Sequence, residues 1–129
     1  MASELRTLGW ATALGLVYVL VAALLATQQR GMRWNAGNRD GEAKLLTGPA
    51  ARAARANHNY LETFAFFAAA VLGVVIAQKN TAHTALGAQV YLWARAAYLP
   101  IYVIGIPYVR SAVWIAALWG LLQVLEGLF

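Results

Sequence analysis

Two runs of polar residues in an otherwise apolar chain have the spacing of a binding site for a charged ligand. The first run is RAARANHNYLETF, in which four residues lie three, four and three positions apart: Arg52, Arg55, Asn59 and Glu62. This spacing places the four side chains on one face of a helix. Such a face combines two guanidinium groups, an amide and a carboxylate, so it predicts recognition of charge rather than core packing.

The second run lies about thirty residues later and is also helical in its spacing. Its members are four, three and four positions apart: Tyr91, Arg95, Tyr98 and Tyr102. An arginine inside an apolar run costs roughly 2.5 to 3.5 kcal/mol even on the mildest insertion scales, so it is expected to face protein or water and to have a partner. One interpretation is therefore a structural ion pair between Arg95 and Glu62 that joins the two helices.

A second interpretation follows from the number of donors, which one carboxylate cannot satisfy. The donor-rich residues are Arg52, Arg55, Asn57, Asn59, Tyr98, Tyr102 and Arg110. An excess of donors around a polar cleft favours an anionic, peptide-like ligand that brings its own carboxylates. His58 sits beside this face, and we interpret it as an interfacial polar residue, with a catalytic role as the alternative.

The elements that position these residues are predicted to be membrane helices. The 129-residue chain is 61% hydrophobic and 12% charged, whereas soluble domains average about a quarter charged. We expect an all-α integral membrane protein built as a four-transmembrane-helix bundle, because each span needs about 20 mostly apolar residues. A single domain covers residues 1–129, with spans at about 7–28, 49–78, 81–104 and 107–127.

The first span is retained as a helix of the protein because LGWATALGLVYVLVAALLATQQ exceeds the roughly 7 to 15 apolar residues of a signal peptide. Gly9 and Gly15 are small residues that would allow close packing of this helix. The loop RGMRWNAGNRDGEAKLLTGP is rich in glycine, asparagine and charge, and it is predicted to be irregular.

The distribution of charge predicts the orientation in the membrane. Six of the ten lysines and arginines lie between Gln28 and Asn59, and short loops rich in positive charge stay in the cytoplasm. We therefore expect the main loop and the polar face to be cytoplasmic and both termini to lie on the opposite side. The remaining loop cations are interpreted as topology determinants or lipid-headgroup contacts: Arg30, Arg33, Arg39 and Lys44.

Several function classes find no support in the sequence. There is no metal-ligand spacing, no phosphate-binding glycine loop and no Ser/His/Asp pattern, and the net charge of +5 has no soluble module that would present it to nucleic acid. The chain has no cysteine, so any thiol chemistry must use a thiol that a ligand brings.

The two runs together resemble the motifs of the MAPEG family, the membrane-associated proteins of eicosanoid and glutathione metabolism. The first motif, RAxxNxxE, covers Arg55 to Glu62, and the second, RxxYxxxY, contains Arg95, Tyr98 and Tyr102, followed by PYVRS with Arg110. The resemblance extends over essentially the whole chain and is closest to the small bacterial members. Thr63 stands where relatives often carry tyrosine after the glutamate.

The resemblance implies a homotrimer that binds glutathione as a co-substrate between neighbouring subunits near the cytoplasmic side. The implied glutathione contacts are Arg52, Arg55, Asn57, Asn59, Glu62, Arg95, Tyr98 and Tyr102. Arg110 is implied as the catalytic residue, because it matches the arginine that stabilises the thiolate. The implied second substrate is a lipophilic small molecule that enters from the bilayer, and the expected location is a bacterial inner membrane.

Three functions remain open from the sequence. The first is a glutathione-dependent transferase or peroxidase. The second is a non-catalytic scaffold or lipid-binding accessory subunit, in which case the protein belongs to a larger membrane assembly. A small transporter is disfavoured, because the polar residues gather toward one side of the membrane and form no path across it.

Overall fold

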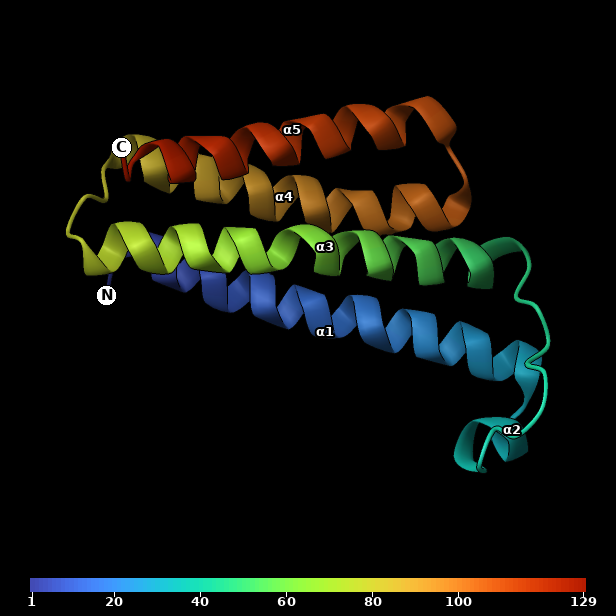
Figure 1. The fold of residues 1–129 in the computed structure, drawn as a ribbon. Helices are drawn as coiled ribbons and strands as arrows, with labels where there is room; N and C mark the ends of the chain where they lie inside the picture. Colours follow the sequence, from blue (N-terminus) through green and yellow to red (C-terminus); the bar gives the residue numbers. More distant parts are fainter.

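The computed structural model describes all 129 residues and contains helices only. The helices are α1 (Ser3–Arg30), α2 (Met32–Ala36), α3 (Gly48–Ile76), α4 (Ala82–Ile104) and α5 (Pro107–Glu126). Figure 1 shows the four long helices side by side, with both termini at one end of the bundle and α2 at the other. We call these the terminal end and the loop end.

The bundle consists of two antiparallel pairs. Helix α1 packs against α3, and α4 packs against α5, while further contacts join α1 to α4 and α3 to both α4 and α5. Since consecutive long helices run in opposite directions, the start of α3, the end of α4 and the start of α5 all lie at the loop end. This arrangement brings the two polar runs of the sequence together.

Three of the helices are long and apolar enough to cross a membrane: α1, α3 and α5. Helix α4 has 23 residues but does not meet the same measure of hydropathy, because it carries Arg95, Gln89 and several tyrosines along its length. Many large apolar side chains point outward, among them Trp10, Leu24 and Ile76. An apolar exterior of this kind is typical of a protein surrounded by lipid.

The bounds of the helices differ from the predicted spans by a few residues. Helix α1 covers Ser3–Arg30 and α3 covers Gly48–Ile76, against about 7–28 and 49–78. The loop prediction was wrong in one respect, since the short helix α2 interrupts it. Gly31 ends α1 at a positive φ of 92°, after which the chain regains helical geometry. The Asn35 side chain then donates to Thr27 Oγ1 at 2.9 Å, which ties α2 back to α1.

The core of the bundle contains a cluster of buried aromatic residues. Tyr18, Tyr60, Phe67 and Tyr91 are all fully buried, and the rings of Phe67 and Tyr91 stack with centroids 4.0 Å apart. Buried hydroxyl groups need hydrogen-bond partners. Accordingly, Tyr60 donates to the carbonyl of Ala11, and Tyr91 shares a 3.0 Å hydrogen bond with Thr63.

The terminal end is held by a buried carboxylate. Glu4 is 2% exposed and accepts a 2.7 Å hydrogen bond from the Thr84 hydroxyl in the first turn of α4. Thr84 and Thr81 also form a reciprocal capping box at the start of α4, which satisfies two backbone donors of that helix. The start of α1 is therefore anchored to the start of α4.

Candidate functional site

A polar cleft of about 380 Å³ opens at the loop end of the bundle, between α3, α4 and α5. Its lining residues are Ala54, Arg55, His58, Asn59, Glu62, Tyr98, Tyr102 and Arg110. A neighbouring hollow of about 250 Å³ shares Arg55, Tyr102 and Arg110 with it and adds Arg52 and the α4–α5 turn. The two form one polar region, in which Arg55 of α3 meets Tyr102 of α4 across a separation of 47 residues.

Local backbone features place these side chains. Pro49 stands in the first turn of α3, where its missing N–H costs nothing. Gly105 ends α4 in the left-handed region at φ 98°, and Pro107 starts α5 two residues later. This tight turn directs the first turn of α5, and with it Arg110, back over the end of α4.

Arg52 stabilises this corner. Its Nε donates to the carbonyl oxygen of Val103 at 2.9 Å, which is one of the carbonyls that a helix end leaves without a partner. A Cβ added at Gly105 would lie 3.3 Å from Arg52 Nε. The glycine therefore provides both the left-handed backbone and the room for the arginine, so Arg52 links α3 to the end of α4.

Two arginines contact the same tyrosine in the cleft. Arg55 Nε donates to the Tyr102 hydroxyl at 3.1 Å, while the Arg110 guanidinium carbon lies 4.6 Å from the centroid of the Tyr102 ring. A cation over an aromatic face is attracted by the ring quadrupole. Tyr102 therefore holds two positive charges close together without neutralising either of them.

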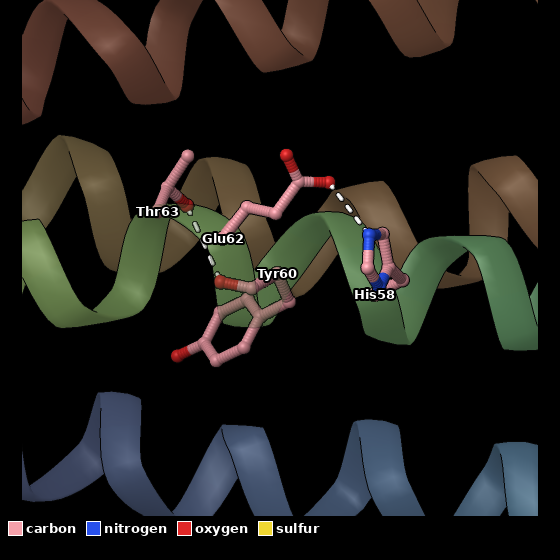
Figure 2. A network of polar contacts seen from close by, with 4 residues as sticks. All are labelled: His58, Tyr60, Glu62 and Thr63. Carbon is pink, nitrogen blue, oxygen red and sulfur yellow. Dashed lines mark hydrogen bonds and ion pairs between the residues drawn. The ribbon is translucent and has the colours of Figure 1, made fainter.

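The carboxylate of the cleft is already paired. Glu62 Oε1 lies 3.3 Å from His58 Nε2, one helical turn earlier on α3, and both side chains are largely exposed. Figure 2 shows Glu62 reaching along α3 toward His58, while Tyr60 points to the opposite side of the helix. No other contact in the chain brings a carboxylate within 4.0 Å of a basic side chain, so Arg52, Arg55 and Arg110 have no carboxylate partner.

The predicted ion pair between Arg95 and Glu62 is absent. Arg95 is fully buried, and none of its three guanidinium nitrogens has a hydrogen-bond partner. Its guanidinium carbon lies 4.3, 5.2 and 5.9 Å from the ring centroids of Tyr98, Tyr60 and Tyr18, respectively. The reason is geometric, because Arg95 points into the core between the helices, whereas Glu62 points out of it.

Tyr98 joins the buried arginine to the cleft. Its ring lies against Arg95 on one side and lines the cleft on the other, and it meets the Tyr102 ring edge-on with centroids 5.4 Å apart. The positive charge of Arg95 therefore lies behind one aromatic layer, and a ligand in the cleft does not contact it directly.

Six of the nine predicted site residues line the cleft: Arg55, Asn59, Glu62, Tyr98, Tyr102 and Arg110. Arg52 lines the neighbouring hollow, and Asn57 and Arg95 line neither. The side-chain oxygens of Asn57 and Asn59 are buried without a hydrogen-bond partner. Buried polar atoms are normally satisfied, so these two oxygens of α3 are unusual.

The structure adds His58 to the residues that line the cleft. The sequence predicted an interfacial polar residue at this position, although its spacing of four residues from Glu62 could have indicated the contact between them. Thr63 lies 3.4 Å from the carbonyl oxygen of Tyr60, toward which its hydroxyl is directed, and it also contacts Tyr91 of α4. It is thus part of the core rather than of the cleft.

The arrangement is suited to anion binding and to stabilising a negative charge. No group of three or more histidine, aspartate or glutamate side chains lies close enough together to hold a metal ion. The chemistry that these residues can perform is charge-assisted hydrogen bonding to carboxylates and electrostatic stabilisation of an anionic nucleophile.

Comparison with known proteins gives one match. The model of the MAPEG family matches residues 7–125, which includes every residue of the cleft. Searches of curated proteins and of solved structures found no match.

Proposed function

The chain belongs to the MAPEG family, and from this premise we propose that it is a membrane-bound transferase or peroxidase that activates the glutathione thiolate against lipophilic electrophiles. The family includes such enzymes as well as non-catalytic members. The observation that carries the proposal is the polar region at the loop end, where Arg55 and Arg110 contact Tyr102, Arg52 lines the neighbouring hollow, and none of the three arginines has a carboxylate partner.

Glutathione complements this charge. It has two carboxylates, and guanidinium groups bind carboxylates through short, charge-assisted hydrogen bonds. Arg55 is placed to bind one carboxylate at the mouth of the cleft, and Arg52 borders the hollow where a second would lie. The exposed carboxylate of Glu62 then supplies an acceptor for the amino group of the ligand.

Arg110 is the residue to which we assign the chemical step. A free thiol has a pKa near 8.5, and a neighbouring guanidinium in a partly desolvated site favours the thiolate, which is the reactive form. Arg110 lies in the first turn of α5, where the positive end of the helix dipole acts in the same direction. The thiolate then attacks an electrophile that reaches the cleft from the bilayer.

The membrane arrangement is part of the same proposal. We infer that α4 is the fourth span, since its 23 residues correspond to about 34 Å of helix and it lies between helices that are apolar enough to span. We further propose a homotrimer in a bacterial inner membrane with the loop end in the cytoplasm. In this assembly a neighbouring subunit would cover the open side of the cleft.

Binding and turnover test the proposal together. Glutathione added to the purified protein in detergent should raise its thermal midpoint, because a ligand of the folded state stabilises it. Conjugation to a lipophilic aryl halide should then be lost in Arg110→Ala while the midpoint shift persists. Arg39→Ala, a change in the exposed loop, is the matched control. A folded protein that shows neither a shift nor turnover contradicts the proposal.

A second function is favoured by one specific observation. Two of the charged residues implied as glutathione contacts are engaged internally, since Glu62 pairs with His58 and Arg95 is enclosed by tyrosines. A non-catalytic scaffold or lipid-binding accessory subunit would use these contacts for stability alone. In that case glutathione causes no thermal shift, and the protein copurifies with a larger membrane assembly.

A further inference from the structure

An apolar groove of about 620 Å³ lies at the terminal end of the bundle, between α1 and α4. It runs from Ser3 to Val17 on α1 and from Gln89 to Ala96 on α4. The polar cleft lies at the loop end and shares no residue with it. The groove is thus a separate feature that the proposed reaction does not use.

The deeper part of the groove is apolar, and its polar groups are gathered at its outer end. There Gln89 Nε2 donates to Thr7 Oγ1 at 2.9 Å, and Trp93 Nε1 donates to Gln89 Oε1 at 3.1 Å. Thr7 in turn donates to the carbonyl of Ser3 at 2.9 Å. These groups satisfy one another, so the wall below them presents apolar surface from Leu14, Val17 and Leu92.

One charge remains free at this outer end. Arg6 lines the groove and makes no ion pair, and the nearest carboxylate along α1, Glu4, is buried against Thr84. Trp10 and Trp93 flank the groove with 64% and 68% of their surface exposed, and Trp93 lies at the middle of α4. The groove therefore combines an anion-attracting end with a hydrocarbon-like interior.

The length of the groove matches one leaflet of a bilayer with its headgroup region. The 14 steps from Ser3 to Val17 correspond to about 21 Å of helix, and one leaflet including its headgroups is roughly 20 to 22 Å thick. A single acyl chain would extend along the groove while its headgroup stays at the interface beside Arg6. A guanidinium there attracts a phosphate of an anionic lipid.

We propose that this groove is a binding site for one anionic phospholipid of the leaflet that faces the chain termini. The acyl chain lies between α1 and α4, and the phosphate pairs with Arg6. The site depends on insertion in a membrane but not on glutathione chemistry, so it exists whether or not the cleft is catalytic.

Native mass spectrometry of the full-length protein with equimolar phosphatidylglycerol and phosphatidylcholine tests this site. We expect one phosphatidylglycerol retained per chain in preference to phosphatidylcholine. Arg6→Gln should reduce that preference about fivefold, while Lys79→Gln, which removes an exposed cation at the same end, should leave it unchanged. The proposal would be overturned if both variants lost the preference for phosphatidylglycerol to the same extent, or if the unaltered protein retained no lipid.

A substitution that fills the apolar part of the groove tests whether the acyl chain binds there. Ala13→Phe places a ring in the groove from an exposed position, so the fold should persist, and both lipids should be lost. Ala116→Phe, on the exposed side of α5, is the matched control. A change of subunit number in Ala13→Phe without loss of lipid would mean that a second copy of the chain occupies the groove, which contradicts the lipid site.

A fluorescence measurement tests the lipid site without any substitution among the residues that line the groove. In a variant with Trp34, Trp114 and Trp119 replaced by phenylalanine, only Trp10 and Trp93 remain. Phosphatidylglycerol with brominated acyl chains should quench their fluorescence more than the brominated phosphatidylcholine does. Equal quenching by the two lipids would show an ordinary lipid-facing surface and overturn the proposal.

Discussion

At the scale of single residues, Tyr102 organises the positive charge of the cleft. It accepts a hydrogen bond from Arg55 through its hydroxyl and contacts Arg110 through its ring. The two contacts use different parts of one side chain, so a substitution can remove one and keep the other. This property allows the two proposed roles, ligand binding by Arg55 and thiolate stabilisation by Arg110, to be tested separately.

Tyr102→Phe should weaken glutathione binding about fivefold, because a typical hydrogen bond contributes about 1 kcal/mol and its loss frees Arg55 to move. The turnover number should change little, since phenylalanine still offers a ring to Arg110. Calorimetric titration and single-turnover kinetics measure the two effects. Tyr108→Phe, at an 88% exposed position outside the cleft, is the control, and an equal effect there would contradict the role of Tyr102.

Arg95 allows a prediction about stability. Its charge is buried without a hydrogen-bond partner, and replacing a buried charge by an apolar side chain of similar volume is often neutral or stabilising. In detergent, Arg95→Met should therefore have a thermal midpoint close to that of the unaltered protein. Arg95→Ala leaves a cavity among the tyrosines and should lose about 3 kcal/mol. If both variants lose the same stability, the guanidinium has a partner that the cation–π contacts do not supply.

The sequence predicted most of the residues that line the cleft, but it did not predict how deeply each side chain is buried. Helical spacing placed Arg55, Asn59 and Glu62 on one face, and all three line the cleft. The same argument grouped Arg95 with Tyr102, yet Arg95 is buried because Tyr18 of α1 covers that level of α4. Spacing along one helix identifies a shared face, whereas burial depends on which neighbour lies over each turn.

At the scale of elements, the close approach of α4 and α5 depends on two glycines that face each other. A Cβ at Gly87 would lie 2.7 Å from the Gly120 carbonyl oxygen, and a Cβ at Gly120 would lie 2.5 Å from the Gly87 carbonyl oxygen. Both distances are shorter than real contacts, and both involve backbone atoms. Small residues that let helix backbones approach are a common means of packing in membranes.

Gly120→Ala should therefore push α5 away from α4 and cost about 1 to 3 kcal/mol, in the range measured for overpacked cores. Unfolding in a denaturing detergent, followed by circular dichroism, measures the loss. Gly9→Ala is a matched control, because a Cβ there meets no atom within 4 Å, and it should be neutral or slightly stabilising. A neutral Gly120→Ala would mean that the two helices are free to separate.

The elements themselves were easier to predict than their contacts. Apolar runs bounded by Pro49, by Lys79 and by Gly105 with Pro107 marked the long helices to within a few residues. Gly9 and Gly15 were predicted to serve close packing, but only Gly15 meets a neighbour, with a Cβ position 3.1 Å from the Tyr60 ring. Which glycine faces a neighbouring helix depends on how each helix is rotated about its own axis. The amino-acid composition does not determine that rotation.

At the scale of the whole molecule, positive charge is unevenly distributed along the bundle axis. The loop end carries seven of the ten lysines and arginines: Arg30, Arg33, Arg39, Lys44, Arg52, Arg55 and Arg110. The terminal end carries Arg6 and Lys79, and Arg95 is buried between them. The proposed trimer cannot be predicted from this charge distribution, because large apolar side chains are exposed on all four long helices and none of them marks a contact between copies.

This charge distribution predicts the orientation, and the absence of cysteine makes that prediction simple to test. Asn38→Cys in the loop and Phe129→Cys at the terminal end each introduce a single thiol at an exposed position. In intact bacterial cells, a membrane-impermeant maleimide should label Phe129→Cys at once and Asn38→Cys only after permeabilisation, because basic loops stay inside. The reverse pattern would place the arginine cleft outside the cytoplasm, away from the compartment where we propose that glutathione is supplied.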